Sequence, residues 1–255
     1  MPKRWTCGAI ALFWLYMMSW LVQRDVLPSF RHREPPSYES VLARERDEAP
    51  ARWTIELGGK RVGSAQTEIE RDADGALVWR GSVKLSELRL RNQERAAIEL
   101  ESEFHIAATG DLSSFEIVGR IGEHDRALMI RGSVSGRVLK LLARAPGFAY
   151  EKDLLYDPHD VVSGITSPLD RLRDLRLGQT WYVRELNPLS GSSLEGTRAE
   201  VTGTEDILWN GELVRTWVVA RQYGGVTAKS WVREDGTVLR QEVPMLWTML
   251  TLVRE

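Results

Sequence analysis

Apolar and polar residues alternate along most of the chain after Arg52. The longest such run, residues 97–106, places its apolar side chains on one face and its charged ones on the other: Ile98, Leu100, Phe104 and Ile106 against Glu99, Glu101, Glu103 and His105. Segments 53–57, 77–85 and 115–121 have the same period of two. This pattern predicts antiparallel strands with one buried face and one solvated face.

Short turn signals separate these runs. They are Gly58-Gly59, Asp74-Gly75, Gly110-Asp111, Ser135-Gly136, Asn210-Gly211, Gly224-Gly225 and Asp235-Gly236. Glycine and asparagine suit tight hairpin turns because the central residues need a positive φ. The spacing of the turns predicts a meander of ten to twelve strands. The spacing is not constant, which argues against a propeller or a solenoid.

One segment has the signals of a short helix. Ser167 suits an N-cap, Pro168 the first helical position and Gly178 the position after the end, so we predict a helix over Pro168–Leu177. A helix of this length cannot cover so wide a sheet. The sheet must therefore close its apolar face by curling into a barrel or half-barrel, by folding back as a sandwich, or by leaving a groove.

The fold class predicted for the soluble part is therefore mainly β, a curled antiparallel meander that is half-barrel or barrel-like, with one short helix. Near the carboxyl end, residues 244–253 are almost entirely apolar. We expect a strand at Leu246–Leu252, either buried on both faces or facing a lipid-like ligand.

The amino-terminal run, residues 5–22, contains no charged side chain. At helical rise it spans about 27 Å, close to the thickness of a bilayer core. A cleaved signal peptide is disfavoured because no small-residue cleavage site follows Val22, and a lipoprotein signal because Cys7 precedes most of the apolar run. We therefore expect a retained single transmembrane helix that acts as a signal anchor.

Lys3 and Arg4 favour a cytoplasmic amino terminus, although Arg24, Arg31 and Arg33 follow on the other side. This predicts a single-pass protein of the cytoplasmic (inner) membrane. The predicted parts are a cytoplasmic end (1–4), the transmembrane anchor (5–22), a polar tether (23–51) and an extracytoplasmic β-rich domain (52–255). Membrane lipid is then the first expected partner, through the anchor.

The composition of the chain excludes several classes of function. The net charge of −2 argues against a nucleic-acid binder, which would show a basic stripe. The single cysteine excludes an intrachain disulfide and a cysteine-built zinc site. The four histidines show no metal-ligand spacing. We therefore expect no metal site and no cofactor.

No catalytic motif is present either. Asp157, His159, Asp160 and Ser163 lie together in a long connection, where functional residues concentrate. However, no Gly-x-Ser-x-Gly elbow exists, and sequence neighbours rarely form a triad. We expect no catalytic residues and a non-enzymatic protein, with a hydrolase that uses the 157–163 loop as a distant alternative.

Three segments carry a resemblance to a known family. They are an early Gly59–Gly63 hairpin, a Pro-Leu-x-x-Leu-x-x-Leu segment ending at Gly178, and a terminal Trp-Val-x-x-Asp-Gly-x-Val-Leu hairpin. Together they resemble uncharacterised bacterial envelope β domains of unknown function, which are lipoprotein-carrier-like. They are also similar to the region that precedes the catalytic core of membrane-anchored transglutaminase-like proteins. The resemblance covers residues 52–255 and implies a curled sheet wrapped partly around a helix, with a hydrophobic groove. It does not imply transglutaminase activity, because the only cysteine lies in the anchor.

Two functions follow as hypotheses. In the first, the domain binds an apolar or lipid-like ligand, or an envelope protein partner. The ligand would lie in a groove lined by Trp181, Trp217, Trp231 and Trp247 together with the Leu246–Leu252 strand. In the second, the tryptophans fill the core, and the domain is a pure interaction or accessory module.

Overall fold

The computed structural model describes Met17 and residues 50–89, 95–122, 124–157, 161–162, 171–172, 174–187, 192–223, 225–245 and 248–255. The predicted anchor and tether lie outside these residues, apart from Met17, Pro50 and Ala51. Within the described residues, no helix combines the length and the apolar character needed to cross a membrane.

The described residues form a single sheet of fifteen strands. The first eight are β1 (Ala51–Leu57), β2 (Lys60–Arg71), β3 (Leu77–Arg89), β4 (Arg95–Ile106), β5 (Leu112–Ile121), β6 (His124–Ser135), β7 (Val138–Ala145) and β8 (Phe148–Leu155). The others are β9 (Val161–Val162), β10 (Thr180–Asn187), β11 (Ser192–Trp209), β12 (Glu212–Tyr223), β13 (Val226–Arg233), β14 (Val238–Met245) and β15 (Thr248–Arg254). The sheet thus has more strands than the ten to twelve that the turn spacing predicts.

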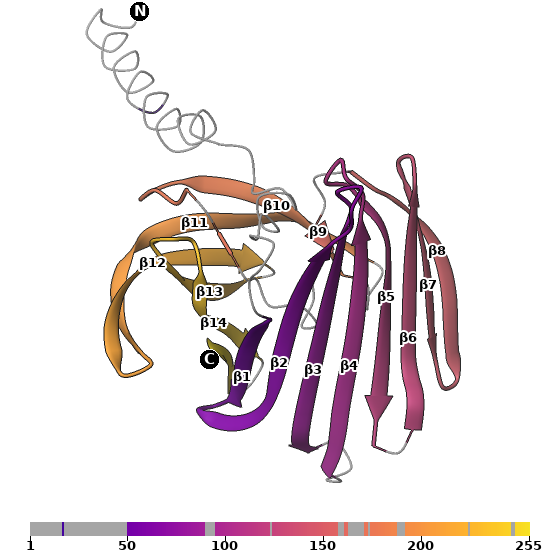
Figure 1. Cartoon of the computed structure of the whole chain (residues 1–255), viewed down its shortest axis with the longest axis horizontal. Coiled ribbons are helices and arrows are strands. Elements are labelled where there is room, and N and C mark those ends of the chain that lie inside the picture. Colours follow the sequence, from indigo (N-terminus) through magenta and orange to yellow (C-terminus); the bar gives the residue numbers. More distant parts are fainter. Residues whose placement is uncertain are drawn as a thin grey trace, which may run out of the picture.

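Two meanders make up this sheet, and they join where the first and last strands pair. Strands β1 to β8 follow one another in order, and so do β10 to β15. β1 pairs antiparallel with β15, with Ile55 opposite Leu252. In Figure 1, β2–β8 stand side by side, while β10–β14 bend round beyond β1. The expected curled antiparallel meander is confirmed.

The sheet does not close into a barrel. Its order begins with β8 and ends with β9, so these two strands are its edges. β9 is short and runs parallel to β10, whereas the other neighbouring strands pair antiparallel. The open, barrel-like form agrees with the half-barrel that we expected.

The turn signals are confirmed where the structure describes them. Asn210 and Gly211 adopt φ values of 50° and 84° between β11 and β12. Gly236, after Asp235, has a φ of 88° between β13 and β14. These residues tolerate the left-handed region that the reversal requires, so the sequence marks the turn accurately. Gly224 lies outside the described residues.

The predicted helix over Pro168–Leu177 is wrong for the part that the structure describes. Arg171 forms an isolated bridge to Thr237, and the Leu172 amide donates to the Gly236 carbonyl at 2.8 Å. Asp174 has a φ of 56°, which breaks a helix. Backbone bonding to the β13–β14 turn and burial of Leu172 outweigh the local capping pattern. Residues 163–170 and Arg173 lie outside the described residues.

The strand expected at Leu246–Leu252 is confirmed for its described residues, which belong to β15, whereas Leu246 and Trp247 lie outside the described residues. β14 runs to Met245 and β15 starts at Thr248, with Met245 opposite Thr248 in an antiparallel pair. The apolar run therefore belongs to two hairpin strands. No glycine or asparagine marks this reversal, so the pattern of apolar residues could not reveal it.

The core lies mainly on one face of the sheet, which we call the apolar face. The first cluster spans β3 to β8 and includes Trp79, Phe104 and Phe115. The second cluster joins the two meanders and includes Trp53, Val83 and Val219. Trp79 and Val83 are four residues apart on one strand, so both clusters occupy the same face. A third cluster, Ile207, Val218, Trp231 and Leu239, lies on the other face of the second meander.

Candidate functional site

Three of the four tryptophans expected to line a groove are described, and they do not belong to one cluster. Trp181 is buried in the second cluster, and Trp217 packs against that cluster. Trp231 belongs to the third cluster instead. Trp247 lies outside the described residues. Among the described residues, Trp231 is therefore separated from Trp181 and Trp217.

Strand alternation is the physical reason. Trp217 pairs with Val232, so these two side chains share a face. Trp231 is the neighbour of Val232 and therefore points to the opposite face, where its indole Nε1 donates to Glu205 Oε2 at 2.9 Å.

A row of small residues crosses the apolar face between the first and second clusters. Ala51, Thr67, Gly81 and Ser102 are consecutive cross-strand partners on β1, β2, β3 and β4. Ala51, Thr67 and Ser102 are all buried. The Ser102 hydroxyl donates to the Gly81 carbonyl at 3.3 Å. The row thus places polar atoms inside an otherwise apolar layer.

Three buried polar atoms beside this row have no hydrogen-bond partner among the described residues: Trp53 Nε1, Thr67 Oγ1 and Trp79 Nε1. Trp53 is 0% exposed, Thr67 1% and Trp79 5%. Leaving one such atom unsatisfied costs about 1–3 kcal/mol. We call Trp53, Thr67, Trp79 and Ser102 the polar strip.

The register places the three residues diagonally to one another on adjacent strands. Thr67 pairs with Ala51, two residues before Trp53, and with Gly81, two residues after Trp79. Thr67 is therefore diagonal to both tryptophans on one face, roughly 7–8 Å apart between Cα atoms. Both indoles carry donors only, and the threonine hydroxyl can donate or accept. This set suits an oxygen acceptor, such as a carbonyl or a carboxylate.

Apolar side chains surround the polar strip. The Trp79 and Phe104 rings lie 5.4 Å apart between centroids, and Phe104 stacks on Phe115 at 5.6 Å. Val83 and Leu100 lie on the other side, in or against the second cluster. The surroundings suit a molecule with one polar group and an apolar body.

Sequence reasoning missed the polar strip, although one signal was present. Within the alternating run 97–106, Ser102 occupies an apolar-face position between Leu100 and Phe104. A polar residue at a buried position of a strand needs a partner. The lone serine could have marked the place, but nothing in the sequence relates it to Trp53 or Trp79.

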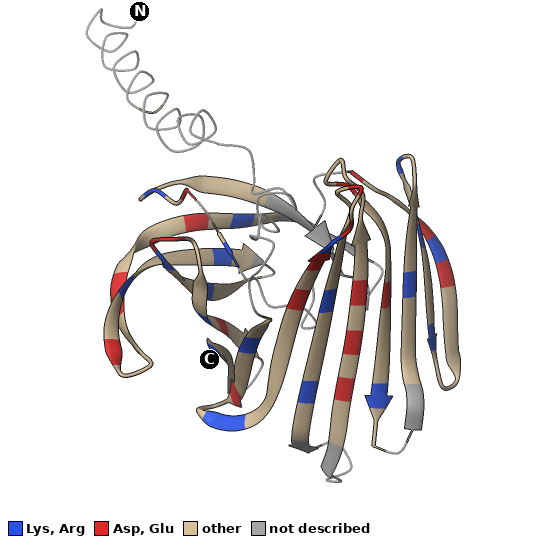
Figure 2. Ribbon diagram, in the orientation of Figure 1, with Lys and Arg blue, Asp and Glu red and all other residues tan. Residues whose placement is uncertain are grey.

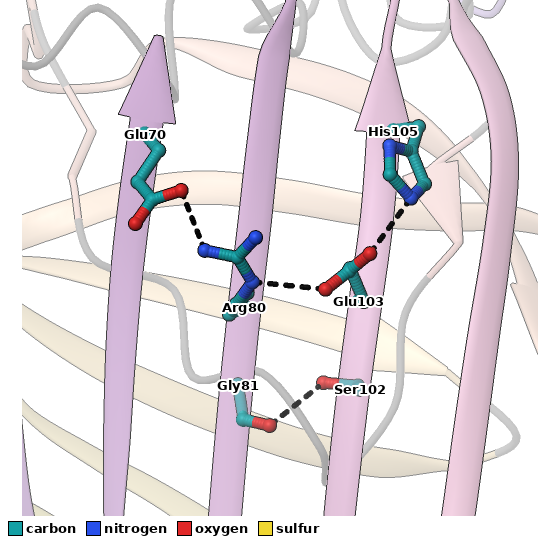
Figure 3. A network of polar contacts seen from close by, with 6 residues as sticks. All are labelled: Glu70, Arg80, Gly81, Ser102, Glu103 and His105. Atoms are coloured by element: carbon teal, nitrogen blue, oxygen red, sulfur yellow. Dashed lines mark hydrogen bonds and ion pairs between the residues drawn. The ribbon is translucent and has the colours of Figure 1, made fainter.

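The opposite face of β2–β8, which we call the charged face, carries a ladder of ion pairs. Arg80 bonds to Glu70 at 2.6 Å and, through Nε, to Glu103 at 2.9 Å. His105 Nε2 lies 2.8 Å from Glu103 Oε1. Figure 3 shows this chain of contacts across three strands. The hydrogen bond from Arg80 lowers the pKa of Glu103, and the hydrogen bonds to Glu103 and Glu70 raise the pKa of Arg80.

The three glutamates of β4 form cross-strand ion pairs, two of them with β3. Glu103 pairs with Arg80, and Glu99 pairs with Lys84 at 3.7 Å. Glu101 pairs instead with Arg120 of β5. In Figure 2 the acidic residues of β4 lie beside basic residues of the neighbouring strands.

Two adjoining hollows of about 380 and 460 Å³ lie on this face, with Glu103 and Glu116 in the lining of both. The two glutamates that they share already have cationic partners, since Glu103 pairs with Arg80 at 2.9 Å and Glu116 with Arg131 at 2.7 Å. Exposed pairs of this kind contribute little stability and no chemistry by themselves. The charged face is thus a solvated, ordered surface.

Other expected features fall outside the described residues or have no counterpart in them. Of the 157–163 loop, His159, Asp160 and Ser163 lie outside the described residues. The structure therefore does not test the hydrolase alternative that uses this loop. Among the residues that the structure does describe, no group of three or more His, Cys, Asp or Glu side chains could hold a metal ion.

No protein-family model and no curated protein match this chain. A solved structure has a similar fold: a β-barrel-like protein of the domain of unknown function DUF1849 from Brucella abortus. The match covers 82% of this chain and 97% of that one, with a TM-score of 0.53 and 9% sequence identity. At this identity the similarity concerns the fold alone. It agrees with the expected uncharacterised β-domain fold.

Proposed function

We propose that this chain is a membrane-anchored extracytoplasmic β domain that catalyses no reaction and binds an apolar or lipid-like ligand at the polar strip. The observation that carries the proposal is that three adjacent strands each hold a buried polar atom without a partner: Trp53 Nε1, Thr67 Oγ1 and Trp79 Nε1.

Buried polar side-chain atoms without a partner are rare in proteins, and each exception needs an explanation. Three on adjacent strands would together cost several kcal/mol at about 1–3 kcal/mol each. A ligand oxygen that accepts from the Thr67 hydroxyl or from one of the indoles would offset part of this cost. Contact between its apolar body and the flanking clusters would add about 25 cal/mol for each Å² buried.

The expected membrane anchor is consistent with binding of a lipid-like ligand. Residues 5–22 would hold the domain at the membrane, and the polar tether 23–51 would separate the two. Amphipathic molecules with one polar group are concentrated at that surface. Anchoring therefore raises the local concentration of the ligand that the polar strip fits.

A second candidate function is an interaction module that binds an envelope protein. It is favoured by the packing of the first two clusters, whose tryptophan, phenylalanine and isoleucine side chains are almost fully buried. It is also favoured by the position of the two hollows, which lie on the charged face. A hydrolase that uses the 157–163 loop stays the distant alternative.

The test compares two threonines that are equally buried. Full-length protein in a non-ionic detergent is mixed with stearate, and native mass spectrometry counts the bound ligand. We expect one stearate per chain, and at least fivefold weaker binding for Thr67→Val. Thr216→Val should bind normally, because the Thr216 hydroxyl already donates to the Glu205 carbonyl at 2.7 Å, away from the polar strip.

The same experiment separates the two candidates. Absence of a stoichiometric complex, or equal loss in both variants, would refute the polar strip as a ligand site and leave the interaction module.

A further inference from the structure

β8 is one edge of the sheet, and its pairing with β7 is regular. All eight of its residues pair in unbroken register with β7, from Ala145–Phe148 to Val138–Leu155. Proteins usually blunt an exposed edge with a bulge, a proline, a very short strand or charged side chains. β8 has neither a bulge nor a proline, and eight residues are enough to template another strand. Its charged side chains, Glu151, Lys152 and Asp153, restrict which strands can pair with it.

The phase of the hydrogen bonds shows which backbone groups face the open edge. The Tyr156 amide donates to the Arg137 carbonyl at 2.9 Å, so this pair is a hydrogen-bonded one. In an antiparallel ladder, bonded and non-bonded pairs alternate. Phe148, Tyr150, Lys152 and Leu154 therefore bond to β7. The other four residues turn their N–H and C=O groups outward: Ala149, Glu151, Asp153 and Leu155.

The side chains of the edge are arranged in three zones. Phe148 is 56% exposed at one end and Leu155 is 65% exposed at the other. The exposed triplet Glu151-Lys152-Asp153 lies between them, with charges in the order acidic, basic, acidic. A strand that pairs with β8 would therefore meet apolar contacts at both ends and alternating charges in the centre.

A second copy of this chain does not fit that edge in the registers that place its charged triplet opposite the same triplet. Cross-strand partners share a face, so a twofold-symmetric antiparallel pair must be centred on one residue of β8. Centring on Glu151 or Asp153 places that carboxylate opposite its own copy. Centring on Lys152 opposes the two lysines and also opposes Glu151 to Asp153. Like charges directly opposite each other are destabilising.

We propose that the β8 edge is a docking strand for an extended segment of another protein, with a basic-acidic-basic triplet opposite Glu151, Lys152 and Asp153. The segment adds as a further strand, and its main chain bonds to the outward groups of Ala149, Glu151, Asp153 and Leu155. Apolar residues two positions beyond either end of its triplet lie opposite Leu155 and Ala149. This site is separate from the polar strip, and either can fail without the other.

The experiment uses the full-length chain and two synthetic seven-residue peptides, Val-Thr-Lys-Glu-Lys-Thr-Val and Val-Thr-Glu-Lys-Glu-Thr-Val. Both triplets read the same in either direction, so strand orientation does not confound the comparison. We expect at least tenfold tighter binding of the Lys-Glu-Lys peptide, with slower hydrogen exchange of the amides of Glu151, Asp153 and Leu155. The charge-reversed triple variant, Glu151→Lys, Lys152→Glu and Asp153→Lys, should prefer the other peptide.

Reversal of the preference requires direct contact with the triplet, and an unchanged thermal unfolding temperature confirms that the variant folds. Equal binding of both peptides, binding of neither, or protection away from β8 would overturn the proposal. A wild-type dimer whose β8 amides are already protected would overturn it too.

Discussion

Thr67 and Thr216 are each 1% exposed, yet the Thr216 hydroxyl donates to the Glu205 carbonyl at 2.7 Å and the Thr67 hydroxyl has no partner among the described residues. Valine has the shape of threonine without the hydroxyl. Thr216→Val should lower the free energy of unfolding by about 1–2 kcal/mol, because a satisfied bond is lost and the Glu205 carbonyl loses its donor.

Thr67→Val should leave the free energy of unfolding unchanged or raise it by up to about 1 kcal/mol, because it removes an unsatisfied polar atom. Urea unfolding of ligand-free protein measures both variants. A large loss of stability from Thr67→Val would mean that its hydroxyl is hydrogen-bonded in the protein alone.

Gly132 faces Phe115 across the β5–β6 pair. A Cβ atom at Gly132 would lie 2.1 Å from Cε1 of Phe115, so alanine forces the ring to move. Because the ring also stacks on Phe104, we expect Gly132→Ala to cost about 1–3 kcal/mol of unfolding free energy. Combining it with Phe115→Leu, which removes the ring, should cost less than the sum of the two single changes. Additive losses in thermal unfolding would contradict this packing.

Asp235 shapes the β13–β14 turn and should make its stability depend on pH. Partial burial by itself raises the pKa of Asp235, but hydrogen bonds from Arg233 and Thr237 outweigh this effect and hold the pKa well below its usual range. The Oδ2 atom accepts from Arg233 Nε at 3.0 Å and the Oδ1 atom from the Thr237 amide at 2.9 Å.

A carboxyl group with a lowered pKa in the folded state stabilises the protein above its unfolded-state pKa of about 3.9. That contribution disappears as the pH falls toward the folded-state value. Asp235→Asn should therefore cost about 1 kcal/mol at pH 7, and the difference from the wild type should shrink below pH 4. Chemical denaturation at pH 7, 5 and 3 tests this, and a constant difference would argue against it.

Ile98 and Glu101 test the register of β4. Ile98 lies opposite Ile121 and is half-buried, whereas Glu101 is exposed on the charged face beside Arg120. Ile98→Asp should be strongly destabilising, because it places a carboxylate against apolar neighbours. Glu101→Ala should change the unfolding free energy by about 0.5 kcal/mol or less. Equal effects in urea unfolding would mean that the faces are misassigned.

The anchor prediction concerns residues outside the described part of the chain. Because no small-residue cleavage site follows Val22, the mature protein should retain residues 5–22 and require detergent for extraction. Amino-terminal sequencing of protein from its native membrane tests this. A mature chain that begins after Val22 would refute it.

The strands, their exposed faces and most of their turns could be predicted from the sequence, because each depends on neighbouring residues. Trp53 and Ile55 are buried as the period of two predicts, and Glu101 and His105 are exposed. Asn210-Gly211 and Asp235-Gly236 reverse the chain where they were expected to, because tolerance of a positive φ is a property of the residue itself.

Tertiary contacts decided the segments where local signals compete with distant partners. Leu172 carries a helical pattern, but its amide bonds to Gly236 and its side chain is buried in the second cluster. The pairing of β1 with β15 joins residues about two hundred positions apart. No local pattern encodes such a contact.

For the candidate site, too, the sequence determined some features and the tertiary structure determined others. Sequence period alone determined that Ser102 belongs on an apolar face and that Trp231 and Val232 point in opposite directions. Only the register of β1, β2 and β3 brings Trp53, Thr67 and Trp79 together. A shift of one residue in either pairing would turn one of them to the other face, and the register is set by bulges and by the summed packing of both clusters.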